Sequence, residues 1–417
     1  MPLPIRTFAA AALSLLALCG PCRAEGVAAD LVQTYLTKGP ISQADEKLVA
    51  LAAGTTGSAD AQLGLGLIRS ARAFEHLAQS LYKYGFISKA RELSGMAGIE
   101  PGSVAANPNP EPITYEQFRG ILQAFINDLQ ASDDALAAVG DKPAKLKVDL
   151  SVVRFDWNGD GKIGPEDQFG AAIADHDDNG NPKPFIVGFD TADAKWLRGY
   201  DNLLMATAKA WLAHDFSESW DAGFGLIFPK AKASMAQADG GSPDSPTLFE
   251  VPKRQADGIA DFITLIHTIR WPVTDKAMWG EVRQHLKKVI ALNRETWALV
   301  RAETDDDHEW LPGPQQKSGV LSGLPVTQER IDAWLGLMTQ LDAVLDGKLL
   351  VPHWRFVKGV NLAKVFDQPK SFDLVLWITG PAALPYLEDG PTMSDSDWGQ
   401  ASRIFEGNLW TYAFYFN

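Results

Sequence analysis

The sequence predicts a mainly α-helical protein, folded as one large multi-helical domain over residues 25–417. Apolar residues recur at spacings of three and four over long stretches, which is the pattern of a helix with one buried face. Such stretches occur in both halves of the chain, and no linker rich in Pro and Gly divides them cleanly. With 46% hydrophobic and 22% charged residues, the composition is that of a globular chain long enough to bury a large core.

Residues 1–24 have the three parts of a secretory signal peptide. Arg6 supplies a positive start, residues 8–18 form an apolar run, and Cys22-Arg23-Ala24 places small residues at a cleavage site. The run of about eleven apolar residues is too short to span a bilayer. We therefore expect cleavage before Glu25 and a periplasmic or extracellular protein.

Both cysteines, Cys19 and Cys22, lie in the segment that would be removed, so we expect no disulfide in the mature chain. Neither follows a small residue, so we expect no lipid anchor. Loss of this segment, which holds two arginines and no acids, takes the net charge from −14 to −16. An acidic surface argues against nucleic acid and anionic membranes as partners. No later run of about eighteen apolar residues predicts a transmembrane helix.

The apolar stripes and their end signals predict six longer helices. Thr114 and Gln117 have the spacing of a capping box, and a basic last turn at Lys83 precedes a glycine. Small residues such as Gly64 and Gly66 predict that the first of these helices packs closely on a neighbour. The predicted spans are 59–84, 114–139, 193–214, 256–269, 275–303 and 328–345.

Shorter elements are expected between these helices. Two short helices fit residues 29–54, with Ser42 and Asp45 in capping-box positions at the second. Residues 185–189 have the composition of a strand. Residues 238–254, rich in Gly, Ser and Pro, indicate a flexible surface loop or a joint between subdomains.

One stretch, from Asp156 to Asp167, indicates a specific chemistry. Positions one, three and five hold Asp156, Asn158 and Asp160, which are short side chains that carry an oxygen. Position six is Gly161, where the backbone must turn with positive φ. Calcium is a hard cation that takes about six to eight oxygens, so this alternation around a tight turn predicts a calcium-binding loop.

Later positions complete this pattern. Lys162 would contribute its carbonyl oxygen, and Ile163 would anchor the loop to the core. Asp167, at position twelve, is one methylene shorter than the usual Glu, which predicts weaker or more magnesium-tolerant binding. Helices over 148–155 and 165–174 are expected to flank the loop. These residues resemble the EF-hand family, which implies Ca²⁺ as the bound ion; the alternative is a turn rich in Asx and Gly without a metal.

A second string of the form D-x-D-x-N-G opens residues 175–186. Pro182 and Ile186 stand at its positions eight and twelve, where an apolar anchor and an acid are expected. Two interpretations remain, a degenerate second calcium site and an acidic turn before the expected strand.

The densest acidic cluster is residues 303–309, in which five carboxylates surround His308. Negative charge at the C-terminal end of a helix opposes the helix dipole, so a compensating cation is expected nearby. The cluster could bind a second cation or an arginine cluster, or supply paired carboxylates for acid–base chemistry. The simpler interpretation is an acidic helix end.

The sequence lacks several catalytic patterns, namely G-x-S-x-G, the P-loop string and H-E-x-x-H. The string G-x-G-x-x-G occurs at 159–164, but it lies inside the calcium loop, where carboxylates would repel a pyrophosphate. His214, His267 and His308 could meet in space, although structural histidines are the simpler expectation. Trp196, Trp211, Trp297 and Trp334 fall in apolar stripes and are expected in the core.

Several stretches resemble a family of uncharacterised secreted proteobacterial proteins that carry one EF-hand. The stretches are residues 155–167, 196–200, 303–312 and 372–380. The resemblance implies an extracytoplasmic calcium-binding protein and no particular activity. Two hypotheses follow: a non-enzymatic, calcium-stabilised protein that binds a partner or ligand, and a hydrolase of cell-envelope polymers that uses the cluster at 303–309.

Overall fold

The computed structural model describes residues 22–54, 58–86, 107–162, 164, 167–170, 174–238, 253–316, 319–320, 324–394, 399 and 403–417. Most of the predicted signal peptide and of the predicted loop at 238–254 lies outside these residues. The described chain is mainly α-helical, as predicted. None of its helices is long and apolar enough to cross a membrane.

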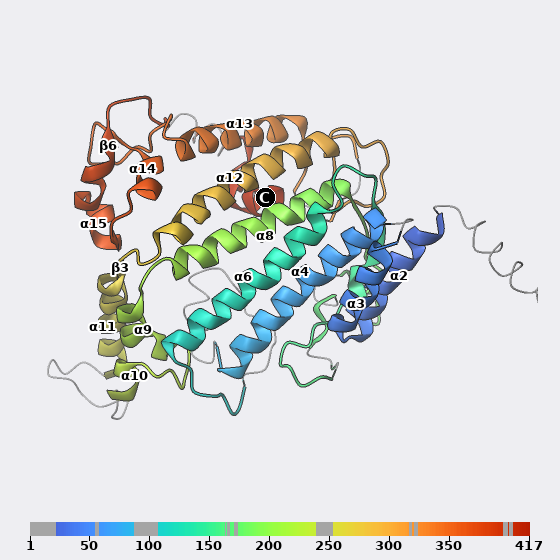
Figure 1. The fold of residues 1–417 in the computed structure, drawn as a ribbon, viewed down its shortest axis with the longest axis horizontal. Coiled ribbons are helices and arrows are strands. Elements are labelled where there is room, and N and C mark those ends of the chain that lie inside the picture. Colours follow the sequence, from blue (N-terminus) through green and yellow to red (C-terminus); the bar gives the residue numbers. More distant parts are fainter. Residues whose placement is uncertain are drawn as a thin grey trace, which may run out of the picture.

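Four long helices lie side by side and form the centre of the fold (Figure 1). They are α4 (Ser58–Lys83), α6 (Tyr115–Ala137), α8 (Thr191–Leu212) and α12 (Lys276–Val300). Each packs on the next in this order, so α6 and α8 each contact a helix on both sides. The apolar stripes of the sequence therefore predicted the central layer, with bounds that differ by a few residues.

Further helices cover the two edges of this layer. On one side α2 (Cys22–Lys38) and α3 (Ile41–Ala52) pack on α4, and Val32, Leu48 and Leu63 are fully buried there. On the other side α13 (Gln328–Leu345) packs on α12 (Figure 1). The C-terminal helix α17 (Leu409–Phe416) joins the same core, in which the rings of Trp297 and Phe416 lie 4.6 Å apart.

Short elements gather at one end of the layer (Figure 1). The first group is α9 (Ser217–Gly223), η3 (Phe224–Leu226), α10 (Ser234–Ala238) and α11 (Lys253–Thr268). The second is α14 (Leu362–Asp367), α15 (Leu374–Thr379) and η4 (Pro381–Tyr386). Two small strand pairs lie here, β3 (Arg270–Trp271) with β5 (Phe372–Asp373) and β4 (Gly359–Val360) with β6 (Leu387–Glu388).

Helix ends follow side-chain capping where the sequence offers it. Thr114 and Gln117 form the predicted capping box, with N–H···O distances of 3.2 and 2.8 Å. Helix α8 begins at Thr191, earlier than predicted, because Asp190 and Asp193 form a second capping box. The box predicted for Ser42 and Asp45 is wrong: the N-cap of α3 is Pro40, whose hydrocarbon ring cannot accept a hydrogen bond.

The strand predicted near 185–189 is confirmed as β2 (Ile186–Asp190), which pairs antiparallel with β1 (Lys145–Asp149). The register runs from Lys145 opposite Asp190 to Asp149 opposite Ile186. The helix predicted over 148–155 is wrong. Leu146 and Val148 are buried while Lys147 between them is exposed, a period of two that suits a strand. A short η1 (Leu150–Val152) then leads to the predicted calcium loop.

Candidate functional site

The loop at 156–167 is wound around the carboxylate of Asp156. One Asp156 oxygen accepts the backbone N–H groups of Gly159 and Asp160 at 2.8 and 3.1 Å, and the other accepts that of Gly161 at 3.0 Å. Gly159 and Gly161 have φ values of +74° and +73°, a region that residues with a Cβ rarely enter. The turn expected at Gly161 is therefore present.

The other predicted ligands belong to the same turn. Asn158 Oδ1 accepts the N–H of Asp160, and Asp160 Oδ1 accepts that of Lys162, both at 2.8 Å. Asp167 is fully buried, and its Oδ2 accepts the N–H of Gly164 at 2.7 Å. These side-chain oxygens thus hold the backbone of the loop in a compact turn. Ile163, the predicted apolar anchor, lies outside the described residues.

Two residues of α4 that sequence reasoning missed contact this loop. Glu75 accepts the N–H of Asp156 at 2.8 Å, and Gln79 donates to the Asp156 carbonyl at 2.7 Å. Burial raises the pKa of Glu75, and the nearby carboxylates of Asp156 and Asp167 raise it further. The loop therefore brings like charges together at α4. No pattern in the sequence marked Glu75, because it precedes the loop by about eighty residues.

The flanks of the loop differ from those of a helix–loop–helix unit. The chain comes from β1 and η1, and Val153 and Phe155 are buried in the core beside α2 and α4. The N–H of Arg154 donates to the Leu36 carbonyl at 2.8 Å. Of the helix predicted to follow the loop, much lies outside the described residues; Asp167, Gly170 and Ala174 are described.

The second string, at 175–186, forms a tighter local turn. Asp177 Oδ1 accepts the N–H groups of Asn179 and Asn181 at 2.9 and 2.8 Å, and Gly180 has a φ of +79°. His176 and Pro182 form an isolated bridge across it. These hydrogen bonds lower the pKa of Asp177, mainly through the N–H of Asn181. Both interpretations of the sequence include such a turn, so a second calcium site at 175–186 stays a prediction.

The acidic cluster at 303–309 divides into a surface half and a buried half. On the surface, Lys145 contacts both Asp305 and Asp307, the latter at 2.6 Å, and Lys147 lies 3.2 Å from Asp307. Hydrogen bonds from these two lysines lower the pKa of Asp307. The compensating cations expected for the cluster are therefore lysines of β1. Nδ1 of His308 contacts the Ile186 carbonyl oxygen at 2.7 Å.

The buried half joins Glu303 and Glu309 to the capping residues of α8. Burial raises the pKa of Glu303 to about 8, with further contributions from Asp190 and Glu309. Burial, followed by the charge of Asp190, raises the pKa of Glu309 to about 7. Burial also raises the pKa of Asp193 well above its ordinary value. Since charged carboxylates would repel one another here, several of them carry protons at neutral pH.

In the described part of the chain, neither histidines nor acids form a three-ligand metal site. His214 is buried beside Trp279 and contacts the Ala210 carbonyl oxygen, whereas His308 packs against Phe185. Among the described residues, no three His, Cys, Asp or Glu side chains form a group that could hold a metal ion. A cation at 156–167 would therefore need oxygens from Asn158, from backbone carbonyls and from water as well.

Comparisons of this chain with protein families, with curated proteins and with solved structures found no match.

Proposed function

We propose that the protein is a secreted or periplasmic calcium-binding protein in which the ion stabilises the loop at 156–167. The observation that carries this proposal is the winding of the loop around Asp156, whose two oxygens accept three successive backbone N–H groups. The turn directs the chain so that Asp156, Asn158 and Asp160 share one short loop. Calcium prefers such oxygen-rich, flexible loops.

Electrostatics near the loop support a divalent cation. Burial raises the pKa of Glu75, and the neighbouring charges of Asp156 and Asp167 raise it further. A cation bound beside Glu75 would favour the ionised form of that carboxyl group. In the proposed site, Asp156, Asn158, Asp160 and Asp167 would offer side-chain oxygens and Lys162 its carbonyl oxygen.

The proposed role of the ion is structural. The loop is tied to α2 through Arg154 and Leu36, and to α4 through Glu75 and Gln79. An ion that binds only the folded loop would stabilise these contacts by mass action. A calcium sensor more often has two intact paired loops, whereas residues 175–186 form a local turn.

The test is calorimetric titration with Ca²⁺, together with thermal melts in Ca²⁺ and in chelator. At about a hundredfold excess of ion over its dissociation constant, we expect a stabilisation of about 2.7 kcal/mol. The double variant Asp156→Ala with Asp160→Ala should lose both the heat of binding and the rise in Tm. No calcium response in the parent protein would overturn the proposal.

Two further variants locate the site. Asp178→Ala removes an exposed acid from a non-ligand position of the neighbouring turn and should leave the calcium response intact. Asp177→Ala tests whether residues 175–186 take part; a halved stoichiometry would identify a second site. If the double variant responds like the parent, the ion binds elsewhere.

The location of the protein is part of the same proposal. Because residues 1–24 have the pattern of a signal peptide, the mature chain would begin at Glu25. N-terminal sequencing of the protein from fractionated cells measures this directly. A cytoplasmic protein that retains Met1 would contradict it.

The alternative is a hydrolase of cell-envelope polymers, and one observation favours it. Glu303 and Glu309, with pKa values of about 8 and about 7, would be protonated near neutral pH, as a general acid must be. The test is turbidity loss of purified cell-wall material with the parent and with Glu309→Gln. The hydrolase hypothesis would be contradicted if activity persisted in Glu309→Gln or if the parent protein had none.

A further inference from the structure

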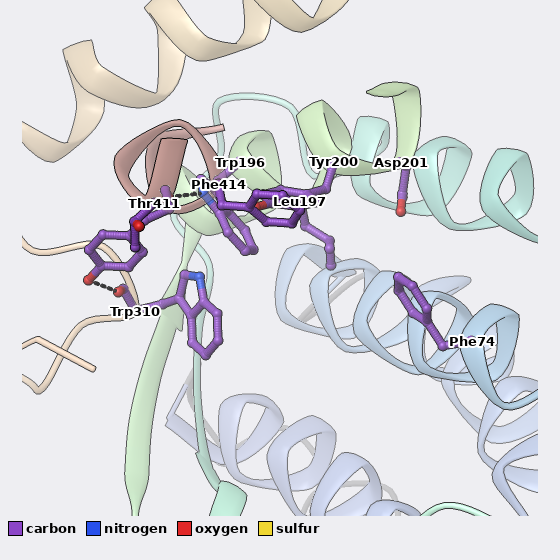
Figure 2. A pocket seen from close by; sticks show the side chains of 9 residues that line it. Phe74, Trp196, Leu197, Tyr200, Asp201, Trp310, Thr411 and Phe414 are labelled. Atoms are coloured by element: carbon purple, nitrogen blue, oxygen red, sulfur yellow. Dashed lines mark hydrogen bonds between the residues drawn. The ribbon is translucent and has the colours of Figure 1, made fainter. Parts of the chain in front are cut away.

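The cavities that border α4 differ in the groups that face them. One of them, of about 380 Å³, lies where α4, α8 and α17 meet, and its wall includes Phe74, Trp196 and Tyr200 (Figure 2). Trp196, expected in the core from the sequence, is instead only half-buried and part of this wall. Asp201 of α8 is fully buried beside it. Among the described residues, only apolar surface faces this cavity, so it offers a ligand no polar contact.

A larger cavity, of about 500 Å³, lies between α4, the turn that joins α2 to α3, and the loop at 156–167. This volume is in the range of small-molecule sites, about 300–1,000 Å³. Polar as well as apolar surface faces this cavity. Three basic residues line it: Lys38 at the end of α2, Arg72 of α4 and Arg154 just before the loop.

None of these three cations forms an ion pair with a carboxylate that the structure describes. Lys38 and Arg72 are exposed, and Arg154 is half-buried. The backbone N–H of Arg154 donates to the Leu36 carbonyl at 2.8 Å, which holds the residue against α2. The chain has 52 acidic and 38 basic residues, so three basic side chains without acids around one cavity are a local excess of positive charge.

The two acids that line this cavity already accept hydrogen bonds from the loop. Asp156 accepts three N–H groups of the loop, and Glu75 accepts the N–H of Asp156 at 2.8 Å. Burial raises the pKa of Glu75, whereas the charge of Arg72, one turn earlier on α4, lowers it. Three cations therefore stand against two acids in the cavity.

The acids next to the cavity have partners as well. Arg72 also lines a smaller adjoining cavity that contains Asp45 and Asp128. Asp128 pairs with His76 at 2.8 Å, and Asp45 pairs with Arg69 at 2.6 Å. Arg72 is thus left without a carboxylate of its own and is open to a ligand.

The N-terminal end of α3 lies in the same wall. Pro40, Ile41 and Ser42 line the cavity, and Pro40 gives the helix no side-chain cap. The first turn of α3 contains no acidic residue either. Because the first N–H groups of a helix lack partners within it and carry partial positive charge, this end adds to the attraction that the three cations exert on an anion.

We propose that this cavity binds a small phosphate monoester. A phosphate group carries about two negative charges near neutral pH and has three acceptor oxygens. Arginine binds such oxygens in pairs, and lysine acts as a point charge, so Arg72, Arg154 and Lys38 suit this group. The cavity holds more than a phosphate ion, and the body of the ester would contact Pro40 and Ile41. The inference does not depend on a bound calcium ion.

Three probes with one aromatic ring and different head groups test the proposal: phenyl phosphate, benzoate and phenol. Binding to the purified full-length protein is measured by calorimetry in chelator, at about pH 8, where the phosphate is a dianion. Phenyl phosphate should bind about tenfold or more tightly than phenol, as a charge-assisted hydrogen bond allows. Its affinity should fall as the salt concentration rises from about 0.05 M to about 0.5 M.

Three results of this experiment would overturn the proposal. The first is no binding of phenyl phosphate at millimolar concentration. The second is benzoate or phenol binding as tightly as phenyl phosphate, which would show that the cavity does not select the phosphate group. The third is inorganic phosphate binding as tightly as the ester, which would show that the body of the ester makes no contact.

Matched variants locate the phosphate group. Arg72→Gln and Arg154→Gln should each weaken phenyl phosphate about fivefold or more and leave phenol unchanged, because each removes a charge and keeps most of the side chain. Lys370→Gln, which removes an exposed cation next to β5, should change neither. Arg72 is exposed, so its variant is expected to fold. If Arg72→Gln and Arg154→Gln, with an unchanged Tm, bind phenyl phosphate as the parent does, these cations do not hold the phosphate and the proposal fails.

Discussion

Leu136 of α6 packs directly on the backbone of Gly66 in α4. A Cβ at position 66 would lie 2.3 Å from both Cγ and Cδ2 of Leu136. On the same side of α6, the Ser132 hydroxyl donates to the Gly66 carbonyl. Small residues such as Gly66 thus permit the close contact between α4 and α6 that the sequence predicted.

Gly66→Ala is expected to destabilise the protein by about 1–3 kcal/mol, because the added methyl overpacks this contact. Urea unfolding measures the change. The matched control is Gly120→Ala at an exposed position of α6, where a Cβ would meet no atom within 4 Å. That control should stabilise the protein by about 0.5–1 kcal/mol, since alanine favours a helix. An unchanged midpoint for Gly66→Ala would contradict the packing described.

Asp133 is expected to be among the costliest side chains to remove. It is 2% exposed and pairs with Arg198 at 2.9 Å and with Lys288 at 2.6 Å, joining α6 to α8 and α12. Asp133→Ala leaves these cations without their acid, which should cost about 3 kcal/mol or more. Glu111→Ala, which breaks an exposed pair with Lys83, should cost less than about 1 kcal/mol. Similar losses for the two variants would refute this ranking.

Thr114→Ala removes the cap of α6 and should cost about 1 kcal/mol, since the backbone N–H of Gln117 loses its acceptor, the Thr114 hydroxyl. Thr114→Ser keeps the hydroxyl and should remain close to the parent. Chemical unfolding of the three proteins measures both effects. A serine variant as weak as the alanine variant would show that the methyl group, not the cap, matters.

The stability of the protein should fall as pH rises from about 6.5 to 8. Glu303 and Asp201, each with a pKa of about 8, and Glu309, with a pKa of about 7, keep protons in the folded protein that the unfolded chain has released. For each such proton, the free energy of unfolding falls by up to about 1.4 kcal/mol as the pH rises by one unit. Thermal melts across this range measure the slope.

Below about pH 6.5 a histidine acts in the opposite direction. Burial lowers the pKa of His285 to about 4, so the unfolded chain binds a proton there that the folded protein does not. Glu303→Gln should flatten the slope between pH 6.5 and 8, whereas His285→Gln should act only at lower pH. A Tm that rises from pH 6.5 to 8 would contradict the protonated carboxyls.

The sequence predicted the long helices and one capping box because these depend on residues three or four apart. It also predicted a strand at 185–189, one residue from the observed 186–190, and the turn at Gly161. It could not predict that Glu75 meets Asp156, or that Glu303 and Glu309 meet Asp190, because these pairs depend on how distant helices pack. The helix expected over 148–155 failed because β2 offers the segment a partner strand, and this tertiary pairing outweighs a helical pattern of a few residues.

The sequence could not predict the cavity beside Asp201 either. Asp201 follows Tyr200 in a stretch that fits a helix, and nothing local distinguishes it from an exposed acid. Only the packing of α4 and α17 against α8 buries it beside aromatic rings. Arg198, three positions before Asp201, pairs with Asp133 of α6, a contact that no local pattern in the sequence marks.

The pairing of β1 with β2 brings the two ends of a long segment of the chain together. Immediately beyond the ladder, the N–H of Leu150 donates to the Phe185 carbonyl at 2.8 Å, so the chain leaves and returns at one place. Between these two ends, the described residues of the segment contact the helical layer, since Val153 and Phe155 are buried beside α2 and α4. A change in an exposed part of this segment would leave the paths of α6 and α8 unchanged, whereas its replacement by a tight turn would also remove the buried Val153 and Phe155. The β1–β2 pair is therefore a fixed base from which the exposed part of the segment can be re-engineered.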